Sequence, residues 1–135
     1  MQDGTLQNSV KLAKDGYIAV TLVGNQTQQT IEDSALQCQR LADQLRTEGK
    51  PVLGLIDFTH EDKFSTGANK ATLDAMGSIN YDRVAAFGKS RVLAEVTELI
   101  IQALGKTDRT KVFATREEAV AWLMMRDPVH GYGIR

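Results

Sequence analysis

Residues 57–67 gather the side-chain types that are most able to do chemistry in this sequence. The segment holds carboxylates, a histidine, a lysine and hydroxyl groups, namely Asp57, His60, Glu61, Asp62, Lys63, Ser65 and Thr66. A hydroxyl beside a histidine can act as a nucleophile, and carboxylates beside a histidine can bind a metal ion. A hydroxyl at the start of a helix can instead accept a phosphoryl group. The segment therefore raises three hypotheses: a hydrolase, a metal site and a regulatory switch.

The pattern disfavours the first two hypotheses. Nucleophilic catalysis by Ser65 needs a base within hydrogen-bond reach and an oxyanion hole, and the sequence has no Gly-x-Ser-x-Gly turn. Neighbouring residues of one loop, here 60–62, cannot readily aim at one metal ion, and the second histidine is the distant His130. The sequence also has no glycine-rich phosphate or dinucleotide motif. We expect a non-enzymatic protein with neither a metal site nor a cofactor.

The residues around the polar segment predict how it is positioned. Residues 52–57 begin with an unbroken apolar run, which is typical of a buried strand. A polar loop is expected next, up to Phe64. The sequence Ser65-Thr66-Gly67 then predicts a helix N-terminus, with Ser65 or Thr66 as the N-cap. In open α/β sheets, ligands and partners are usually bound at such a strand end.

The rest of the chain predicts an alternation of strands and helices. Alternating residues over 5–13 and an apolar run over 17–23, joined by Asp15-Gly16, predict a hairpin with a type I′ turn. Further short strands are expected over 83–88 and 111–114. Helical spacing of apolar residues predicts helices between Thr30 and Gly49, from 66 to 76 or 80, between Ser90 and Gly105, and between Thr115 and Asp127.

Local signals add detail to three of these helices. Thr30 with Asp33 resembles a weak capping box, and Thr115 with Glu118 forms a clear one. The apolar stripe of the third helix is expected to contain Val92, Leu93, Val96, Leu99, Ile100, Ala103 and Leu104. We expect Cys38 to be a small buried side chain and Trp122 to anchor the last helix over the sheet.

The element order is β-β-α-β-α-β-α-β-α. Short links between alternating strands and helices require parallel neighbours and right-handed crossovers. We therefore predict one α/β domain over 1–135, built as a mixed sheet of about five strands with an N-terminal hairpin and four helices. The ends, 1–4 and 127–135, are expected to be flexible.

Two segments of the C-terminal half carry a family resemblance. Residues 81–88 read Tyr-Asp-Arg-Val-Ala-Ala-Phe-Gly, and residues 111–123 read Lys-Val-Phe-Ala-Thr-Arg-Glu-Glu-Ala-Val-Ala-Trp-Leu. Both resemble segments of the STAS superfamily, the anti-sigma-factor-antagonist fold, and within it the SpoIIAA-like proteins grouped with STAS/SEC14 domains. The resemblance covers roughly residues 12–123 and implies the STAS fold.

The resemblance also implies a regulatory function. In STAS antagonists the loop after the central strand ends in Asp-Ser-Ser-Gly, and a partner kinase phosphorylates the second serine. The corresponding residues here are Phe64, Ser65, Thr66 and Gly67, so Thr66 takes the switch position and Ser65 stands beside it. The partner, another protein, would then meet the loop residues Asp57, His60, Asp62, Lys63 and Gly67. The simpler interpretation is that one hydroxyl only caps the helix.

The kinship with SEC14 implies an alternative function, a carrier or sensor of a small apolar or lipid-like ligand. The ligand would occupy a pocket between the sheet and the helices. The candidate lining residues are Phe58, Phe64, Met76, Tyr81 and Phe87. A switch predicts an exposed Thr66, a carrier predicts an apolar cavity, and an enzyme predicts a hydrogen bond from Ser65 or Thr66 to His60.

Composition restricts the partners further. The formal net charge is −1, and no basic stripe with interleaved aromatics is present, so we expect no nucleic-acid binding. No apolar run is long enough to span a bilayer, so we expect a cytoplasmic protein without integral membrane contact. The edge of the N-terminal hairpin, which carries Leu6 and Val10, would allow a homodimer.

Overall fold

The computed structural model describes residues 7–88, 91–105 and 108–125, apart from the side chains at 61, 62, 64, 91–93, 96 and 100. The expected flexible ends, Leu6 and the expected cap Ser90 lie outside the described residues. The elements follow the predicted order. They are β1 (Ser9–Leu12), β2 (Tyr17–Gln26), α1 (Gln28–Thr47), β3 (Leu53–Phe64), α2 (Thr66–Ile79), β4 (Arg83–Phe87), α3 (Arg91–Leu104), β5 (Thr110–Phe113) and α4 (Arg116–Leu123).

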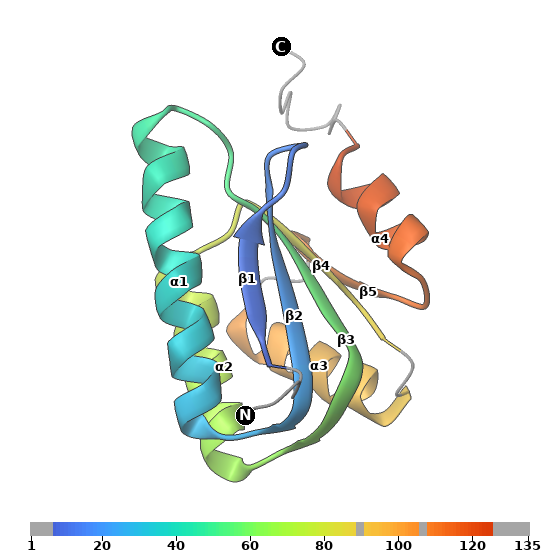
Figure 1. Ribbon diagram of the computed structural model, residues 1–135. Coiled ribbons are helices and arrows are strands. Elements are labelled where there is room, and N and C mark those ends of the chain that lie inside the picture. Colours follow the sequence, from blue (N-terminus) through green and yellow to red (C-terminus); the bar gives the residue numbers. More distant parts are fainter. Residues whose placement is uncertain (1–6, 89–90, 106–107, 126–135) are drawn as a thin grey trace.

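The five strands form one sheet in the order β1-β2-β3-β4-β5 (Figure 1). β1 is antiparallel to β2, and the other neighbours are parallel. The predicted fold class, a mixed α/β sheet with an N-terminal hairpin and four helices, is confirmed. Because β2 and β3 run in the same direction, both deliver their carboxyl ends, and the helices that follow, to the same edge of the sheet.

The hairpin turn differs from the predicted type I′. A type I′ turn needs a positive φ at both central residues, but Asp15 does not have one, and Gly16 does (φ 96°). The backbone closes with Ala13 N donating to Tyr17 O (2.8 Å) and Gly16 N donating to Ala13 O (2.9 Å). The loop is therefore one residue longer than predicted, and Gly16 supplies the left-handed position that ends it.

β2 and β3 are both longer than predicted. Residues 58–64, expected to be a loop, continue β3, and they pair with the end of β2 up to Gln26↔Phe64. The pairing contains register shifts between Thr21 and Val23 and between Gly24 and Gln26. Two polar strand ends satisfy each other's backbone groups here, so neither needs an alternating apolar face. The prediction of a loop was wrong for that reason.

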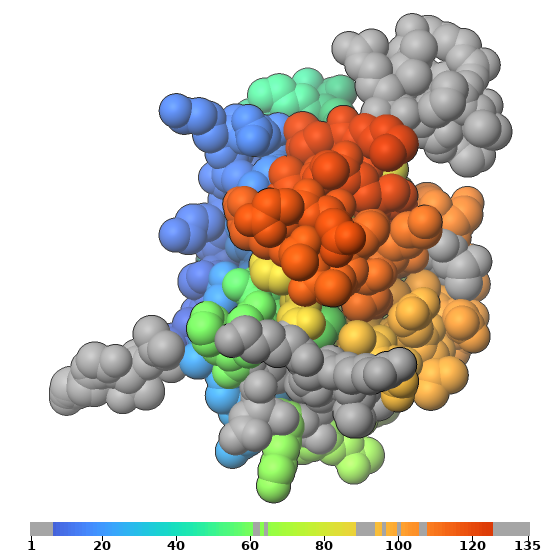
Figure 2. Space-filling model, turned by 90° about the vertical axis from the view of Figure 1, so that its right-hand side faces the viewer, coloured from blue at the N-terminus to red at the C-terminus, as the bar shows by residue number. Residues whose placement is uncertain are grey.

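The two faces of the sheet carry separate apolar clusters. On one face, strand residues such as Ile18, Val20 and Val84 pack with α1 and α2, and α3 completes the same side. On the other face, the shorter α4 covers the cluster (Figures 1 and 2). Its buried members are Tyr17, Leu53, Leu55, Ala85, Phe87, Ala119 and Leu123.

The helix signals were partly correct. α1 is capped by Thr27 in a capping box with Thr30, not by Thr30 with Asp33. Thr115 caps α4 as predicted, accepting a hydrogen bond from Glu118 N (3.2 Å).

The predicted apolar stripe of α3 was correct in part. Ile101 is 5% exposed, whereas Leu99 is 65% exposed. Ala103 is also exposed. Leu104 packs against the first cluster as predicted, and Thr97 and Ile101, which were not in the predicted stripe, also face the sheet layer. The side chains of the remaining stripe residues, Val92, Leu93, Val96 and Ile100, lie outside the described residues.

Cys38 and Trp122 take their predicted places. Cys38 is buried in the first cluster. The Trp122 ring lies 5.8 Å from the Phe113 ring, and the guanidinium of Arg83 lies 4.3 Å above it. Arg83 Nη2 also donates to Trp122 O (2.8 Å). These contacts hold α4 on the sheet and confirm Trp122 as a core anchor.

Candidate functional site

The start of α2 forms the first candidate site, here called the strand-end site and made of Ser65, Thr66 and Gly67. Ser65 is the N-cap, and its Oγ accepts a hydrogen bond from Ala68 N (3.0 Å). Its backbone N donates to Gln26 O (3.0 Å) at the end of β2. Thr66 is the first residue of α2, and it is exposed. The structure thus assigns the cap to Ser65 and leaves Thr66 at the surface.

A second helix begins beside this site. A Cβ atom built on Gly67 would lie 3.2 Å from the Cβ of Gln28, the first residue of α1. Neither described first turn, of α1 or of α2, contains an acidic residue, whereas the first turn of α4 contains Glu117 and Glu118. A helix N-terminus carries a partial positive charge that acidic side chains normally offset. Two helix N-termini whose first turns contain no acidic residue therefore lie together at the strand-end site.

A buried network of amides and hydroxyls supports this edge of the sheet. Gln26 is 1% exposed, and its Oε1 accepts from Asn8 Nδ2 (2.8 Å) and from Thr30 Oγ1 (3.0 Å). Asn8 Oδ1 in turn accepts from Val23 N (2.8 Å). Because Gln26 also receives the backbone N–H of Ser65, the network links the first strand, α1 and the cap of α2. Sequence reasoning missed both residues: Asn8 fell within the predicted strand 5–13 and was given no role of its own, and Gln26 was read as part of a polar connecting segment.

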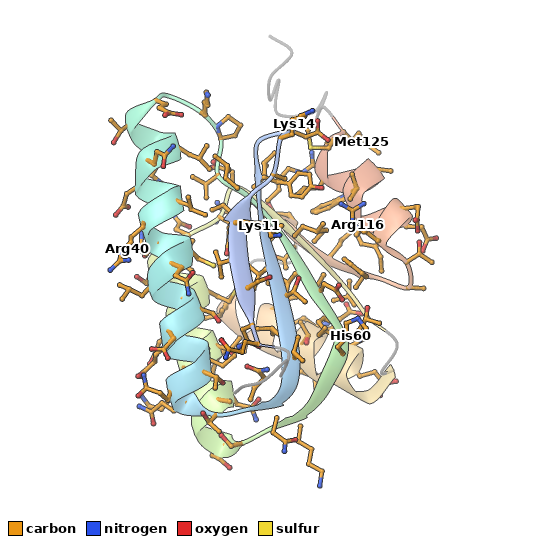
Figure 3. The ribbon with its side chains drawn as sticks, viewed as in Figure 1. Lys11, Lys14, Arg40, His60, Arg116 and Met125 are labelled. Atoms are coloured by element: carbon orange, nitrogen blue, oxygen red, sulfur yellow. The ribbon has the colours of Figure 1, made fainter. Side chains whose placement is uncertain are left out.

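The predicted partner-loop residues lie on the end of β3 rather than on a loop. Asp57 is half-buried, and its Oδ1 accepts from Thr59 N (2.8 Å), next to a register shift. His60 and Lys63 are exposed, and Figure 3 shows His60 on the side of β3 away from α1. Gly67 lies against α1, as described above. Asp62 belongs to β3 by its backbone, and its side chain lies outside the described residues.

The geometry expected of a hydrolase is not found at the described residues. The hydroxyl of Ser65 is engaged as the cap of α2, and within the described ranges no hydrogen bond joins it or Thr66 to His60. Among the described residues, no three His, Cys, Asp or Glu side chains are close enough together to bind a metal ion. None of the helices that the structure describes is both long enough and apolar enough to cross a lipid bilayer.

The second candidate site is a cavity of about 110 Å³ between the sheet and helices α1, α2 and α3. Its wall is largely apolar, and three of the predicted pocket residues, Phe58, Met76 and Tyr81, belong to it. Phe87 does not, because it lies in the cluster on the opposite face. The side chain of Phe64 lies outside the described residues. Helix α3 contributes Thr97 and Ile101 to the wall.

The cavity wall contains polar groups in unusual surroundings. Burial raises the pKa of the Cys38 thiol, and a hydrogen bond with Tyr81 only partly opposes this effect. Burial, and then the neighbouring Cys38, raise the pKa of the Tyr81 hydroxyl well above its ordinary value. Both groups are therefore neutral at physiological pH. The Oδ1 atom of Asn69 is buried and receives no hydrogen bond in the part of the chain that the structure describes.

Asn69 was missed by sequence reasoning. It stands in the second turn of α2, where a single asparagine has no periodic signal. Asparagine is a mediocre helix former, and the cap is already supplied by Ser65. The weak signal available in the sequence was therefore a polar residue of low helix propensity on the side of a helix that otherwise buries alanines.

Comparison with known proteins identifies the fold. No family model matches the sequence, and no curated protein matches it. Solved structures do. An uncharacterized DUF3478-family protein with a SpoIIAA-like fold from Shewanella loihica matches with a TM-score of 0.63 and 22% identity, over 91% of this chain and 99% of that one.

The anti-sigma factor antagonist SpoIIAA matches in two states. Its unphosphorylated form gives a TM-score of 0.60 at 13% identity, covering 85% of this chain and 96% of that one. The phosphorylated form of the Bacillus cell fate determinant SpoIIAA gives 0.57 at 14% identity, covering 85% and 97%. The chain therefore has the SpoIIAA-like fold, as the resemblance in the sequence implied.

Proposed function

We propose that this protein is a non-enzymatic regulatory module that binds another protein through the strand-end site and the adjoining end of β3. Phosphorylation of Thr66, or of its neighbour Ser65, would control the interaction. The observation that carries the proposal is the exposed hydroxyl of Thr66 at a helix N-terminus that lacks acidic residues and lies against a second such N-terminus. A protein with the same fold has been solved in phosphorylated and unphosphorylated forms.

Electrostatics supports Thr66 as the modified residue. A phosphate adds nearly two negative charges and accepts hydrogen bonds from free backbone N–H groups. On Thr66 it would lie at the start of α2 and near the start of α1, and exposed Lys63 lies close in sequence. Modification of Ser65 would instead alter the oxygen that caps Ala68 N. The same charge on Thr115 would meet Glu117 and Glu118 in the first turn of α4.

Mass spectrometry of the protein purified from its own host tests the proposal directly. We expect a phosphate that is removed by phosphatase and that maps to Thr66 or Ser65. Thr66→Glu should then change capture of the partner protein, whereas Thr66→Val should behave like the unmodified protein. Ala121→Glu, which adds the same charge on the exposed surface of α4, is the matched control. Phosphate confined to other residues, with capture unaffected by Thr66→Glu, would contradict the proposal.

The cavity favours a second candidate function, the carrier or sensor of a small apolar ligand. In support of it, Phe58, Met76 and Tyr81 line the cavity together, and pockets for such ligands have mostly apolar walls. We further propose that the protein is cytoplasmic. We also propose that two copies can pair along the exposed edge of β1. In support of the edge, β1 is the first strand of the sheet and has one partner, β2, within the described residues.

A further inference from the structure

The cavity has largely apolar walls, and one of its lining residues carries a buried oxygen for which the described residues supply no hydrogen bond. The oxygen is Oδ1 of Asn69, which stands on α2 among the lining residues. Buried acceptors are nearly always completed by a protein donor, water or a ligand, because an unsatisfied one is costly. Water in a cavity typically needs several polar partners, and most of this wall is apolar.

Several other polar side chains of the wall have hydrogen-bond partners among the described residues. Thr72 Oγ1 donates to Ala68 O (2.8 Å), and Ser34 Oγ accepts from Asn8 Nδ2 (3.3 Å). Cys38 and Tyr81 form a hydrogen bond with each other. Asn69 Oδ1 is a buried acceptor for which the described part of the protein shows no donor, and Asn69 is one of the residues that line the cavity.

We propose that the cavity binds a small neutral molecule with an apolar body and a single hydrogen-bond donor, such as a phenol or a short alcohol, and that the donor binds Asn69 Oδ1. The inference rests on the second candidate function and names its ligand class. Charge is excluded because none of the described lining residues is charged, and an unpaired buried charge is strongly disfavoured. An apolar cavity of about 150 Å³ can bind benzene, so about 110 Å³ limits the buried part of the ligand to about one ring.

Three ring probes of similar size separate the contribution of the apolar ring to binding from the contribution of the hydrogen-bond donor. Benzene has no polar group, phenol carries a donor, and pyridine only accepts; all are used at a pH where they are neutral. Each is titrated against the full chain while the methyl NMR signals of Met76 and Ile31, both in the wall, are followed. We expect phenol to bind more tightly than benzene, and pyridine to bind most weakly.

Two variants assign the binding to the cavity and the preference to Asn69. Asn69→Leu should lower the affinity ratio of phenol to benzene about tenfold, because it removes the acceptor and keeps the volume. Asn25→Leu, on an exposed residue of β2, should leave the ratio unchanged. Ala75→Leu, which projects into the cavity wall, should abolish binding of every probe. Asn69→Ala gives the same comparison of ratios if Asn69→Leu does not fold.

The outcomes distinguish a failure of the proposed ligand class from a failure of the second candidate function, on which that ligand class rests. An unchanged ratio in Asn69→Leu would overturn the donor assignment and leave apolar ligand binding intact. A preference for pyridine would overturn it too, by showing that the amide presents its NH₂ group. Failure of all probes to bind the wild-type protein would overturn ligand binding in the cavity, and with it both the inference and the second candidate function.

Discussion

The two faces of the sheet are packed differently. On the α4 face, the cluster around Phe87 and Leu123 is closed by Trp122, whose ring contacts Phe113 and Arg83; in Figure 2, α4 fills the centre of this face. On the opposite face, three helices cover the same strands and still leave a cavity of about 110 Å³, and Asn69 Oδ1 has no hydrogen bond to any described residue. The face covered by three helices is therefore packed less completely than the face covered by α4 alone.

Side-chain size explains the difference. The wall of the cavity includes Ala35, Ala75 and Ala86 together with Ser34 and Cys38, so the helices approach the sheet without filling the space between. α4 is a short helix, but it places Leu123 and Trp122 on the sheet. Because empty space in a core lowers stability, we expect side chains on the α4 face to be packed more completely than those around the cavity, which is the space we propose for ligand binding.

The largest effect should come from the α4 face. Leu123 is 1% exposed, and Leu123→Ala should lower the free energy of unfolding by about 3 kcal/mol, through lost burial and a new cavity. Urea denaturation measures the change. Leu99→Ala is the control: the periodic pattern predicted Leu99 in the core, but it is 65% exposed, so its loss should stay within about 0.5 kcal/mol. Equal losses in the two variants would break the comparison.

The next largest effect should come from a substitution that lowers the stability of the protein and also fills the cavity. A Cβ atom on Gly88 would overlap the ring of Phe58, which lines the cavity. Gly88→Ala should therefore push this ring into the open space, cost about 2 kcal/mol by overpacking and prevent the binding of benzene-sized probes. Gly77→Ala, at a helical glycine with open space around it, should instead stabilise the protein by about 0.5–1 kcal/mol. Unchanged probe binding in Gly88→Ala would show that Phe58 does not border the binding space.

A smaller effect of opposite sign is expected at Asn69. Asn69→Leu removes a buried acceptor that has no hydrogen bond among the described residues and introduces a better helix former, so it should raise the free energy of unfolding by about 1 kcal/mol. Thermal unfolding of the ligand-free protein, with Asn25→Leu as the surface control, measures the gain. A loss of stability would mean that Asn69 makes a structural contribution, and that the cavity face is not adapted to binding at this residue.

Much of the fold could be predicted from the sequence because the signals were local and repeated. Apolar runs, helical spacing and the Thr115–Glu118 cap give the element order without any tertiary information. The same logic failed at residues 58–64, where a polar strand is stabilised by pairing with an equally polar partner. It also failed at Leu99, which fits the apolar spacing of α3 but is 65% exposed, whereas Ile101 is the buried residue.

The two candidate sites were predictable to different degrees. Ser65 and Thr66 are adjacent in sequence and carry the signature of a helix start, so their placement follows from local chemistry. Phe58, Met76 and Tyr81 were predicted together, but Phe87 was assigned to the wrong face because the β4 segment is apolar on both sides. The buried oxygen of Asn69 depends on how three helices pack, which no local pattern in the sequence encodes.

The smallest predicted effect concerns alkaline pH and the neutral pair in the cavity wall. Burial raises the pKa of Cys38 above its ordinary value of 9.0, so the unfolded chain releases this proton first. The stability that the protonated Cys38 thiol contributes is therefore present below about pH 9, and it is lost as the pH rises further. At pH 9 the loss should be about 0.4 kcal/mol, since half of the unfolded thiols are ionised. Cys38→Val should flatten this alkaline decline in urea denaturation, whatever it costs at neutral pH, and an unchanged slope would show that the thiol ionises as readily in the folded protein.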